Sequence, residues 1–507
     1  MGILALLMAY PVILVLISTS SGPGISPDSV SYLAGAQSLL DNGTLLTFTG
    51  EPLTLFPPGQ SVLLAGLGFV GIGLTAAAIV VNLICAVLLV GGTYLLGLRV
   101  LHSSSLALVS AAFVSLSAAT VREFSMVWSE PVFSVLVLGV LLLLVRVATR
   151  RQVTWANVIA LAVLASAATS FRYAGFVMIP VIAVVVLWSA MPAGRGRAWA
   201  LGVVSLLGSS VGLIALALRN ISVGSGALGE RYPSAVTLEG AVKSTINLLG
   251  TYFVPSETSL LWAELGVVVA VLLVAGIWLG LMRRSRGVVV LSLFVTVYWL
   301  SLWWSQMTTR LDSATERLLA PALAPMVILV IFAVSAIGAT VCKQLADSRF
   351  FSAGAAHRFV LVVGWVVLIA VLGLQVLHGV RFARDSATAG IGYNSSATLN
   401  APVSQAIAAL PEDSGIASND PWRAYWVAGH GPSVDIPPIA AEWPQERIDA
   451  DAVRLLDAVR EGSVDHVVYF TGARNAWTPE ELSALGLTLT PVGEFDDGTL
   501  FSVAFAN

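Results

Sequence analysis

The chain has 507 residues, of which 57% are hydrophobic and only 11% are charged, and its mean hydropathy is +0.87. A soluble globular chain carries roughly 25% charged residues, so this composition excludes a soluble enzyme and a disordered protein. The net charge of −3 provides no basic field for polyanions, which excludes nucleic acid as a partner.

Eleven segments are apolar enough to be membrane spans, since a span needs about 20 apolar residues. The first also resembles a signal peptide, but no Lys or Arg precedes it, so we expect an uncleaved anchor. The segment 61–73 follows a Pro-Pro-Gly break and is too short to span, so we expect it at the interface or as a re-entrant segment. The eleven segments cover about residues 2–20, 74–98, 105–121, 131–148, 155–171, 174–190, 198–218, 260–281, 287–305, 318–341 and 359–379.

Basic residues in the short loops set the expected orientation. With the N-terminus in the cytoplasm, Asp347 is the one acidic residue of 29 that falls in an inner loop. We therefore expect a multi-pass protein of the cytoplasmic (plasma) membrane, with its N-terminus inside and its C-terminus outside. The inner basic residues are Arg99, Arg146, Arg150, Arg151, Arg195, Arg197, Arg283, Arg284, Arg286, Lys343, Arg349 and Arg358.

The last part of the chain, residues 380–507, is polar and holds 17 acidic residues against 7 arginines. Residues 450–462 have the period of an amphipathic helix, and 464–471 are typical of a buried strand. Residues 487–505 predict a hairpin around an Asp-Gly turn. We expect a small soluble α/β domain outside the membrane.

The predicted fold class is thus a polytopic α-helical membrane protein. Residues 1–379 form the transmembrane domain, with a long first outer loop at 21–73, and 380–507 form the extracytoplasmic domain. The spans hold essentially no charge at mid-depth, and ion-coupled transporters normally need such charge. The ionisable residues lie at the outer ends of spans, which places any chemistry at the outer membrane surface.

The first outer loop begins with a helix, and Asp28 lies in its first turn. An Asp at a helix start caps free backbone N–H groups, which is the structural explanation for it. A helix N-terminus also favours negative charge, and a carboxylate at the membrane surface can act as a general base. The two roles are compatible, so Asp28 is the first candidate for catalysis.

Two further charged residues lie at the outer ends of spans. Glu130, in Ser129-Glu130-Pro131, is either a helix-start acid or a functional carboxylate. Arg172 stands between two spans with almost no loop, where it either snorkels to the surface or binds a ligand.

The later outer loops contribute Arg219, Asn220 and Arg231, followed by Glu316 and Arg317. Each residue alone is explained as a solvated loop charge. As a set, several arginines and carboxylates converge on one face of the bundle, and guanidinium groups bind phosphate bidentately. A lipid phosphate of the outer leaflet is the anion expected there, so we expect membrane lipids as partners.

These motifs, in their order and shared outward placement, resemble the GT-C superfamily of polytopic glycosyltransferases. The likeness is greatest to its protein O-mannosyltransferase and lipid A aminoarabinose transferase branch, and it covers most of the chain. Ser29 follows Asp28 where many members carry Glu, which weighs against protein O-mannosylation and leaves the base role intact. The matching residues are Asp28 and Tyr32, Pro57-Pro58-Gly59, Ser129-Glu130-Pro131, Arg172-Tyr173 with Gly175, Arg219-Asn220 with Gly229 and Arg231, Glu316 to Pro321, and Asn419-Asp420-Pro421 with Tyr425.

The resemblance implies a glycosyltransferase that moves a hexosyl or pentosyl group from a polyprenyl-phosphate donor to a lipid, glycan or protein acceptor, with inversion. It implies that Asp28 is the general base and that Glu130 is a second carboxylate, which holds substrate or, with Asp28, a divalent cation (Mg²⁺ or Mn²⁺). The implied donor-phosphate ligands are Arg172, Arg231 and Arg317. Further candidates for the same site are Tyr32, Arg219, Asn220 and Glu316.

Two other functions stay open at this point. One is a transporter or flippase of lipid-linked glycans, against which the lack of charge at mid-depth weighs. The other is a non-catalytic scaffold whose outer domain binds a partner. The convergence of carboxylates and arginines on one face weighs against a scaffold.

Overall fold

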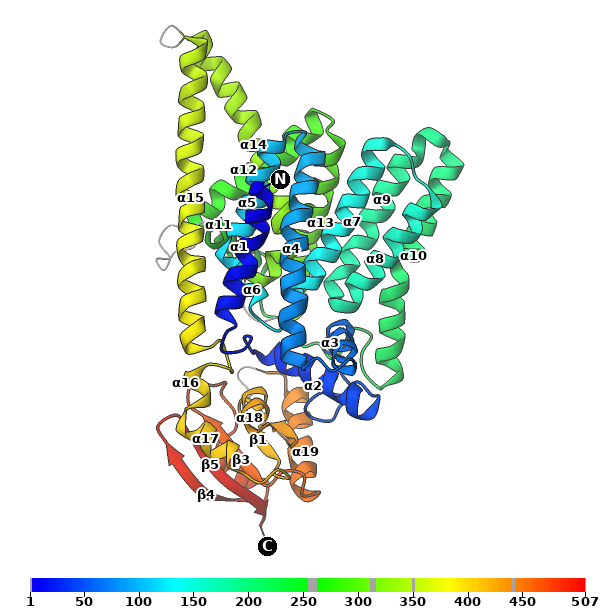
Figure 1. Cartoon of the computed structure of the whole chain (residues 1–507). Coiled ribbons are helices and arrows are strands. Elements are labelled where there is room, and N and C mark those ends of the chain that lie inside the picture. Colours follow the sequence, from blue (N-terminus) through cyan, green and yellow to red (C-terminus); the bar gives the residue numbers. More distant parts are fainter. Residues whose placement is uncertain are drawn as a thin grey trace.

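The computed structural model describes residues 2–253, 262–310, 316–348, 352–429, 431–439 and 443–506. The protein is a helical bundle with a small domain at one end, which we call the domain end of the bundle (Figure 1). The N-terminus lies toward the opposite end, and the C-terminus lies on the small domain. Arg349 and the first residues of the expected span 260–281 lie outside the described residues.

Within these ranges, eight helices are long and apolar enough to cross a membrane, and a bent pair raises the number to nine. Two more apolar helices, α1 (Gly2–Ser18) and α8 (Trp155–Phe171), have 17 residues each and fall just short of the usual span length. A multi-pass membrane protein is confirmed, and the number of 11 spans stays a prediction. The eight are α4 (Leu74–Leu101), α7 (Glu130–Arg150), α9 (Met178–Ala190) with its flanking 3₁₀ turns η1 (Tyr173–Val177) and η2 (Met191–Ala193), α10 (Arg195–Ser222), α12 (Trp262–Met282), α13 (Arg286–Thr308), α14 (Glu316–Asp347) and α15 (Ala353–Ala389).

The expected span 105–121 is not one straight helix. It is the pair α5 (Ser104–Leu116) and α6 (Ala118–Phe124), which are bent by 53° relative to each other. Ser117 between them is extended, with φ −60° and ψ 125°. The Ala118 N–H at the break donates to the Gln375 side chain of α15 at 2.9 Å, so this buried backbone group is satisfied away from water.

Two helices of the first outer loop lie between the bundle and the small domain (Figure 1). The helix α2 (Pro27–Asn42) begins after Ser26, whose hydroxyl accepts a hydrogen bond from the Ser29 N–H. The expectation that Asp28 is the cap is therefore corrected: Ser26 caps the helix, and the Asp28 carboxylate is available for other contacts. The helix α3 (Gly59–Phe69) has 11 residues, which is shorter than a span, and its expected place at the interface or as a re-entrant segment stays a prediction.

The C-terminal domain is an α/β unit whose described sheet has the order β2-β1-β3-β5-β4. The strand β1 pairs in parallel with β2 and β3, and β5 pairs antiparallel with β3 and β4. The predicted hairpin is therefore present as β4 and β5. The bounds are β1 (Ile416–Ser418), β2 (Ser433–Asp435), β3 (His466–Phe470), β4 (Leu487–Phe495) and β5 (Gly498–Phe505), with α16 (Ser396–Leu399), α17 (Pro402–Ala408), α18 (Pro421–Ala428), α19 (Gln445–Arg460) and α20 (Pro479–Ala484).

Aromatic contacts hold this domain against the first outer loop. The Phe48 ring centroid lies 5.8 Å from that of Trp422 and 5.4 Å from that of Tyr425. These aromatic contacts fix the domain beside the loop that carries Asp28.

The helix α15 continues to Ala389, ten residues beyond the expected domain boundary at 379, and that boundary stays a prediction. The remaining helix, α11 (Leu238–Phe253), precedes α12.

Candidate functional site

The centre of the candidate site is an ion pair between α2 and α14. Arg317 Nη1, in the first turn of α14, lies 2.6 Å from Asp28 Oδ2, and both side chains are largely buried. The Arg317 guanidinium also lies 5.2 Å from the ring centroid of Trp128, whose indole N–H donates to the Ser26 hydroxyl at 2.8 Å. Two segments that are far apart in the sequence thus meet at Asp28.

A second ion pair lies beside the first. Glu130 is the first residue of α7 and is fully buried, and its Oε1 lies 2.5 Å from Arg172 Nη1, at the junction of α8 and η1. Burial alone would lower the pKa of Arg172, but the Glu130 carboxylate, with smaller contributions from Tyr32 and Asp28, raises it above its ordinary value. Arg172 therefore remains a cation in this site.

The two ion pairs form one cluster. Arg317 Nε lies 3.9 Å from Glu130 Oε1, so Arg317 stands between the two carboxylates. The Tyr32 hydroxyl, on α2, is 3.1 Å from the Ser129 hydroxyl, and Arg172 donates to that same Ser129 oxygen at 3.4 Å. Burial, and then the Asp28 charge, raise the pKa of Tyr32, so its hydroxyl stays protonated and can donate a hydrogen bond.

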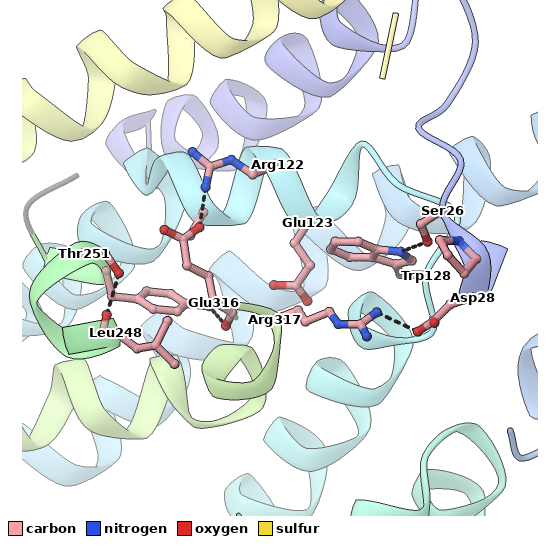
Figure 2. Close-up of a pocket in the computed structure, with 12 residues that line it drawn as sticks. Ser26, Asp28, Arg122, Glu123, Trp128, Leu248, Thr251, Glu316 and Arg317 are labelled. Carbon is pink, nitrogen blue, oxygen red and sulfur yellow. Dashed lines mark hydrogen bonds and ion pairs between the residues drawn. The ribbon is translucent and has the colours of Figure 1, made fainter. Parts of the chain in front are cut away.

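A cavity of about 510 Å³ opens next to this cluster (Figure 2). Its walls come from the start of α2, from α6 and Trp128, from the end of α11 and from the start of α14. Asp28 and Arg317 lie at one end of it, and Glu316 lies at the other, paired with Arg122 Nη1 at 2.6 Å. Cavities that hold small organic ligands have about this volume.

Three of the expected residues lie elsewhere, around residues 53–55 of the first outer loop. Arg219 donates to the Leu53 carbonyl at 2.5 Å, and Arg231 donates to the Leu55 carbonyl at 3.0 Å. Asn220 donates to the Tyr173 hydroxyl at 2.7 Å. These side chains hold the loop in place, and they are not among the residues that line the cavity.

The expected divalent cation does not fit this arrangement. Among the described residues, no group of three or more His, Cys, Asp or Glu side chains is arranged to hold a metal ion. The Arg317 guanidinium already lies between Asp28 and Glu130, the two carboxylates expected to bind Mg²⁺ or Mn²⁺. A second cation at that position would be repelled by Arg317.

Two residues of the cavity, Arg122 and Glu123, are absent from the set expected from the sequence. Both lie on α6, directly after a run of residues that reads as one apolar span. The sequence does place these two adjacent charges in a short loop, within eight residues of Glu130, and this proximity could have indicated them as site residues. The bend at Ser117, which brings them to the cavity, has no signature in the apolar pattern.

No protein-family model matches the chain, and no curated protein sequence matches it. Solved structures do match in fold. ArnT from Cupriavidus metallidurans bound to undecaprenyl phosphate aligns with a TM-score of 0.60 and 14% identity, over 99% of this chain and 98% of that one. The archaeal oligosaccharyltransferase AglB from Archaeoglobus fulgidus, in complex with an inhibitory peptide and a dolichol-phosphate, aligns with a TM-score of 0.55 and 13% identity, over 92% and 69%. The chain therefore has the fold of the GT-C membrane glycosyltransferases.

Proposed function

We propose that the protein is a membrane glycosyltransferase that moves a sugar from a polyprenyl-phosphate donor to an acceptor hydroxyl. The observation that carries this proposal is the Asp28–Arg317 pair at one end of a cavity of ligand size, in a chain with the GT-C fold. The similar structures were solved with undecaprenyl phosphate and with dolichol-phosphate, which supports a polyprenyl-phosphate donor. The acceptor is a lipid, a glycan or a protein.

In the proposed reaction, Asp28 takes the proton from the acceptor hydroxyl. The acceptor oxygen attacks the anomeric carbon of the donor sugar from the face opposite the phosphate. The new C–O bond forms as the bond from the anomeric carbon to the phosphate oxygen breaks, so the configuration inverts. The polyprenyl phosphate leaves with the bonding electron pair.

The arginines of the site stabilise the charge that develops on the leaving phosphate. Groups fixed in advance at such a position contribute most to the rate, because they need no rearrangement during the reaction. Arg317 is the first candidate, since it contacts Asp28 and lines the cavity, and Arg172 is the second. Glu130 orients both arginines. Arg219, Asn220 and Arg231 act indirectly, by holding the loop at 53–55 in place. Tyr32 donates a hydrogen bond, and Glu316 orients Arg122.

The proposed location of this reaction is the outer face of the plasma membrane. The basic residues Arg99, Arg146 and Arg150 line a second, smaller hollow of about 300 Å³. They lie on α4 and α7, at the ends of these helices away from the C-terminal domain (Figure 1). Basic loops favour the cytoplasmic side, which supports a cytoplasmic N-terminus and an outer position for the C-terminal domain and the site.

The test is transfer by the purified protein in liposomes. The donors are undecaprenyl phosphate linked to radiolabelled mannose, glucose or galactose, and the acceptors are the envelope lipids and glycans of the host cell. A transferase moves label to an acceptor and releases free undecaprenyl phosphate in equal amount, above the level in protein-free liposomes. Movement of the intact donor across the bilayer with no release of undecaprenyl phosphate would contradict the proposal and favour a flippase.

A further inference from the structure

Glu123 is the one carboxylate of the cavity that lacks an arginine partner among the described residues. Asp28 pairs with Arg317 and Glu316 pairs with Arg122, each at 2.6 Å. The Glu123 side chain lies between these two pairs and points into the cavity (Figure 2). The residue is 6% exposed, and its Oε1 has no hydrogen-bond partner in the part of the chain that the structure describes.

A buried carboxyl group without a hydrogen-bond partner is costly, because it loses its hydration and gains no hydrogen bond in return. Nearly all buried polar groups in proteins are satisfied, so an exception that faces a cavity indicates a missing ligand. Within the described residues, the Oε1 atom of Glu123 makes no hydrogen bond to another side chain. The group that completes its hydrogen bonding therefore comes from whatever occupies the cavity.

Apart from its polar and charged residues, the cavity wall is apolar, and its apolar lining includes Ala119, Trp128, Leu248 and Tyr252. The Trp128 ring is held in position by its hydrogen bond to Ser26. Apolar and aromatic walls with a few polar groups that fix orientation are typical of small-ligand sites, and a sugar ring offers both C–H faces and hydroxyl groups to such a wall.

The position of Arg317 at the cavity indicates that the cavity holds the sugar of the donor and not that of the acceptor. Arg317 lines the cavity at the end that holds Asp28. A donor phosphate bound to Arg317 therefore places the sugar attached to that phosphate inside the cavity, with its anomeric carbon next to Asp28. Glu123 lies on the side of this position that faces the Arg122–Glu316 pair (Figure 2).

We propose that Glu123 binds a hydroxyl group of the donor sugar and thereby selects the sugar that is transferred. The inference rests on the proposed transferase function and adds a specificity residue to it. The two neighbouring arginines already pair with Asp28 and Glu316, so the proposed ligand of Glu123 is a neutral hydroxyl group that makes a hydrogen bond with its side-chain oxygen. The contact is made in the bound donor and does not require Glu123 to take part in the chemical step.

The experiment compares binding of bare undecaprenyl phosphate with binding of undecaprenyl phosphate linked to mannose, glucose or galactose. Wild type, Glu123→Ala and Glu123→Gln are measured in lipid nanodiscs. The control is Glu239→Ala, which removes a carboxylate that is 76% exposed on α11. Thermal midpoints and the affinity for bare undecaprenyl phosphate report whether each variant is folded.

In the wild type, at least one sugar-linked lipid binds more tightly than bare undecaprenyl phosphate. Glu123→Ala lowers the affinity for that lipid by at least about tenfold, the loss expected when one buried hydrogen bond is left unmade, and leaves bare-lipid affinity unchanged. Glu123→Gln, which still accepts a hydrogen bond, and Glu239→Ala stay within about threefold of wild type.

Three results would overturn the inference. Either Glu123→Ala retains the full preference for the sugar-linked lipid, or Glu123→Gln loses as much as Glu123→Ala, or no sugar-linked lipid binds better than the bare one. Failure of the proposed function is a different result, since the wild type would then bind neither undecaprenyl phosphate nor its sugar-linked forms.

Discussion

The Glu130–Arg172 pair offers a quantitative test of the site, because its two partners differ in burial. Glu130 is fully buried, whereas the Arg172 side chain is 21% exposed. Removing one partner of a buried pair costs about 3–5 kcal/mol, because the other charge is left without compensation. Arg172→Met leaves Glu130 with only the more distant Arg317, 3.9 Å away, so we expect a loss near that range.

Glu130→Gln leaves a guanidinium that still reaches water and the Ser129 hydroxyl, so its cost is smaller, about 1–3 kcal/mol. The double variant has no uncompensated charge. It should be more stable than Arg172→Met alone, which requires the coupling between the two positions to exceed the cost of Glu130→Gln; we expect a coupling of about 3 kcal/mol. From highest to lowest, the expected thermal midpoints are those of wild type, Glu130→Gln, the double variant and Arg172→Met. The midpoints of Glu130→Gln and the double variant should be close.

The assay is the thermal midpoint of all variants in one detergent. Glu239 and Lys243 are a matched control pair, 2.8 Å apart and more than 70% exposed, and the same four-variant cycle there should give about 0–1 kcal/mol. If Arg172→Met and the double variant melt together, or if both cycles give the same coupling, the reasoning about the buried pair is refuted.

Two further predictions concern packing and pH. A Cβ on Gly175 would lie 2.6 Å from the Thr169 backbone nitrogen, so Gly175→Ala should cost about 1–3 kcal/mol, while Gly364→Ala, with nothing within 4 Å, should not lower the thermal midpoint. If Gly175→Ala and Gly364→Ala have equal thermal midpoints, the close approach of the Thr169 backbone to Gly175 is contradicted. Burial, and then Asp435, raise the pKa of Asp451 from 3.8 to about 6. The folded state therefore binds a proton more readily, and lowering the pH from 7 to 5 should stabilise wild type relative to Asp451→Asn by about 1 kcal/mol. A difference in midpoint that does not change with pH would contradict this.

Much of the architecture could be predicted from the apolar pattern alone. Long apolar runs mark spans, because a span must satisfy its backbone polar groups within a helix. The polar C-terminal segment, with its strand patterns, is not apolar enough to be a span. The break at Ser117 could not be predicted, because it depends on Gln375, a residue more than 250 positions away that satisfies the Ala118 N–H.

The candidate site was predictable as a set but not as pairs. Counting spans predicts that Asp28, Glu130, Arg172 and Arg317 lie on one side of the membrane, and the structure brings these four together. Which acid meets which arginine depends on how the helices pack, and the sequence spacing carries no information on that. The same count predicts that Arg219 and Arg231 lie on that side too, yet they contact the loop at 53–55.

The role of Asp28 tests the account most directly. The measurement is the rate of sugar transfer by Asp28→Asn and wild type, from whichever undecaprenyl-phosphate sugar the wild type uses, with undecaprenyl phosphate binding as the check on folding. A general base contributes about 10²–10⁴ to the rate, so the account predicts a loss of that size in Asp28→Asn while binding is retained. Transfer by Asp28→Asn within about threefold of wild type would contradict it.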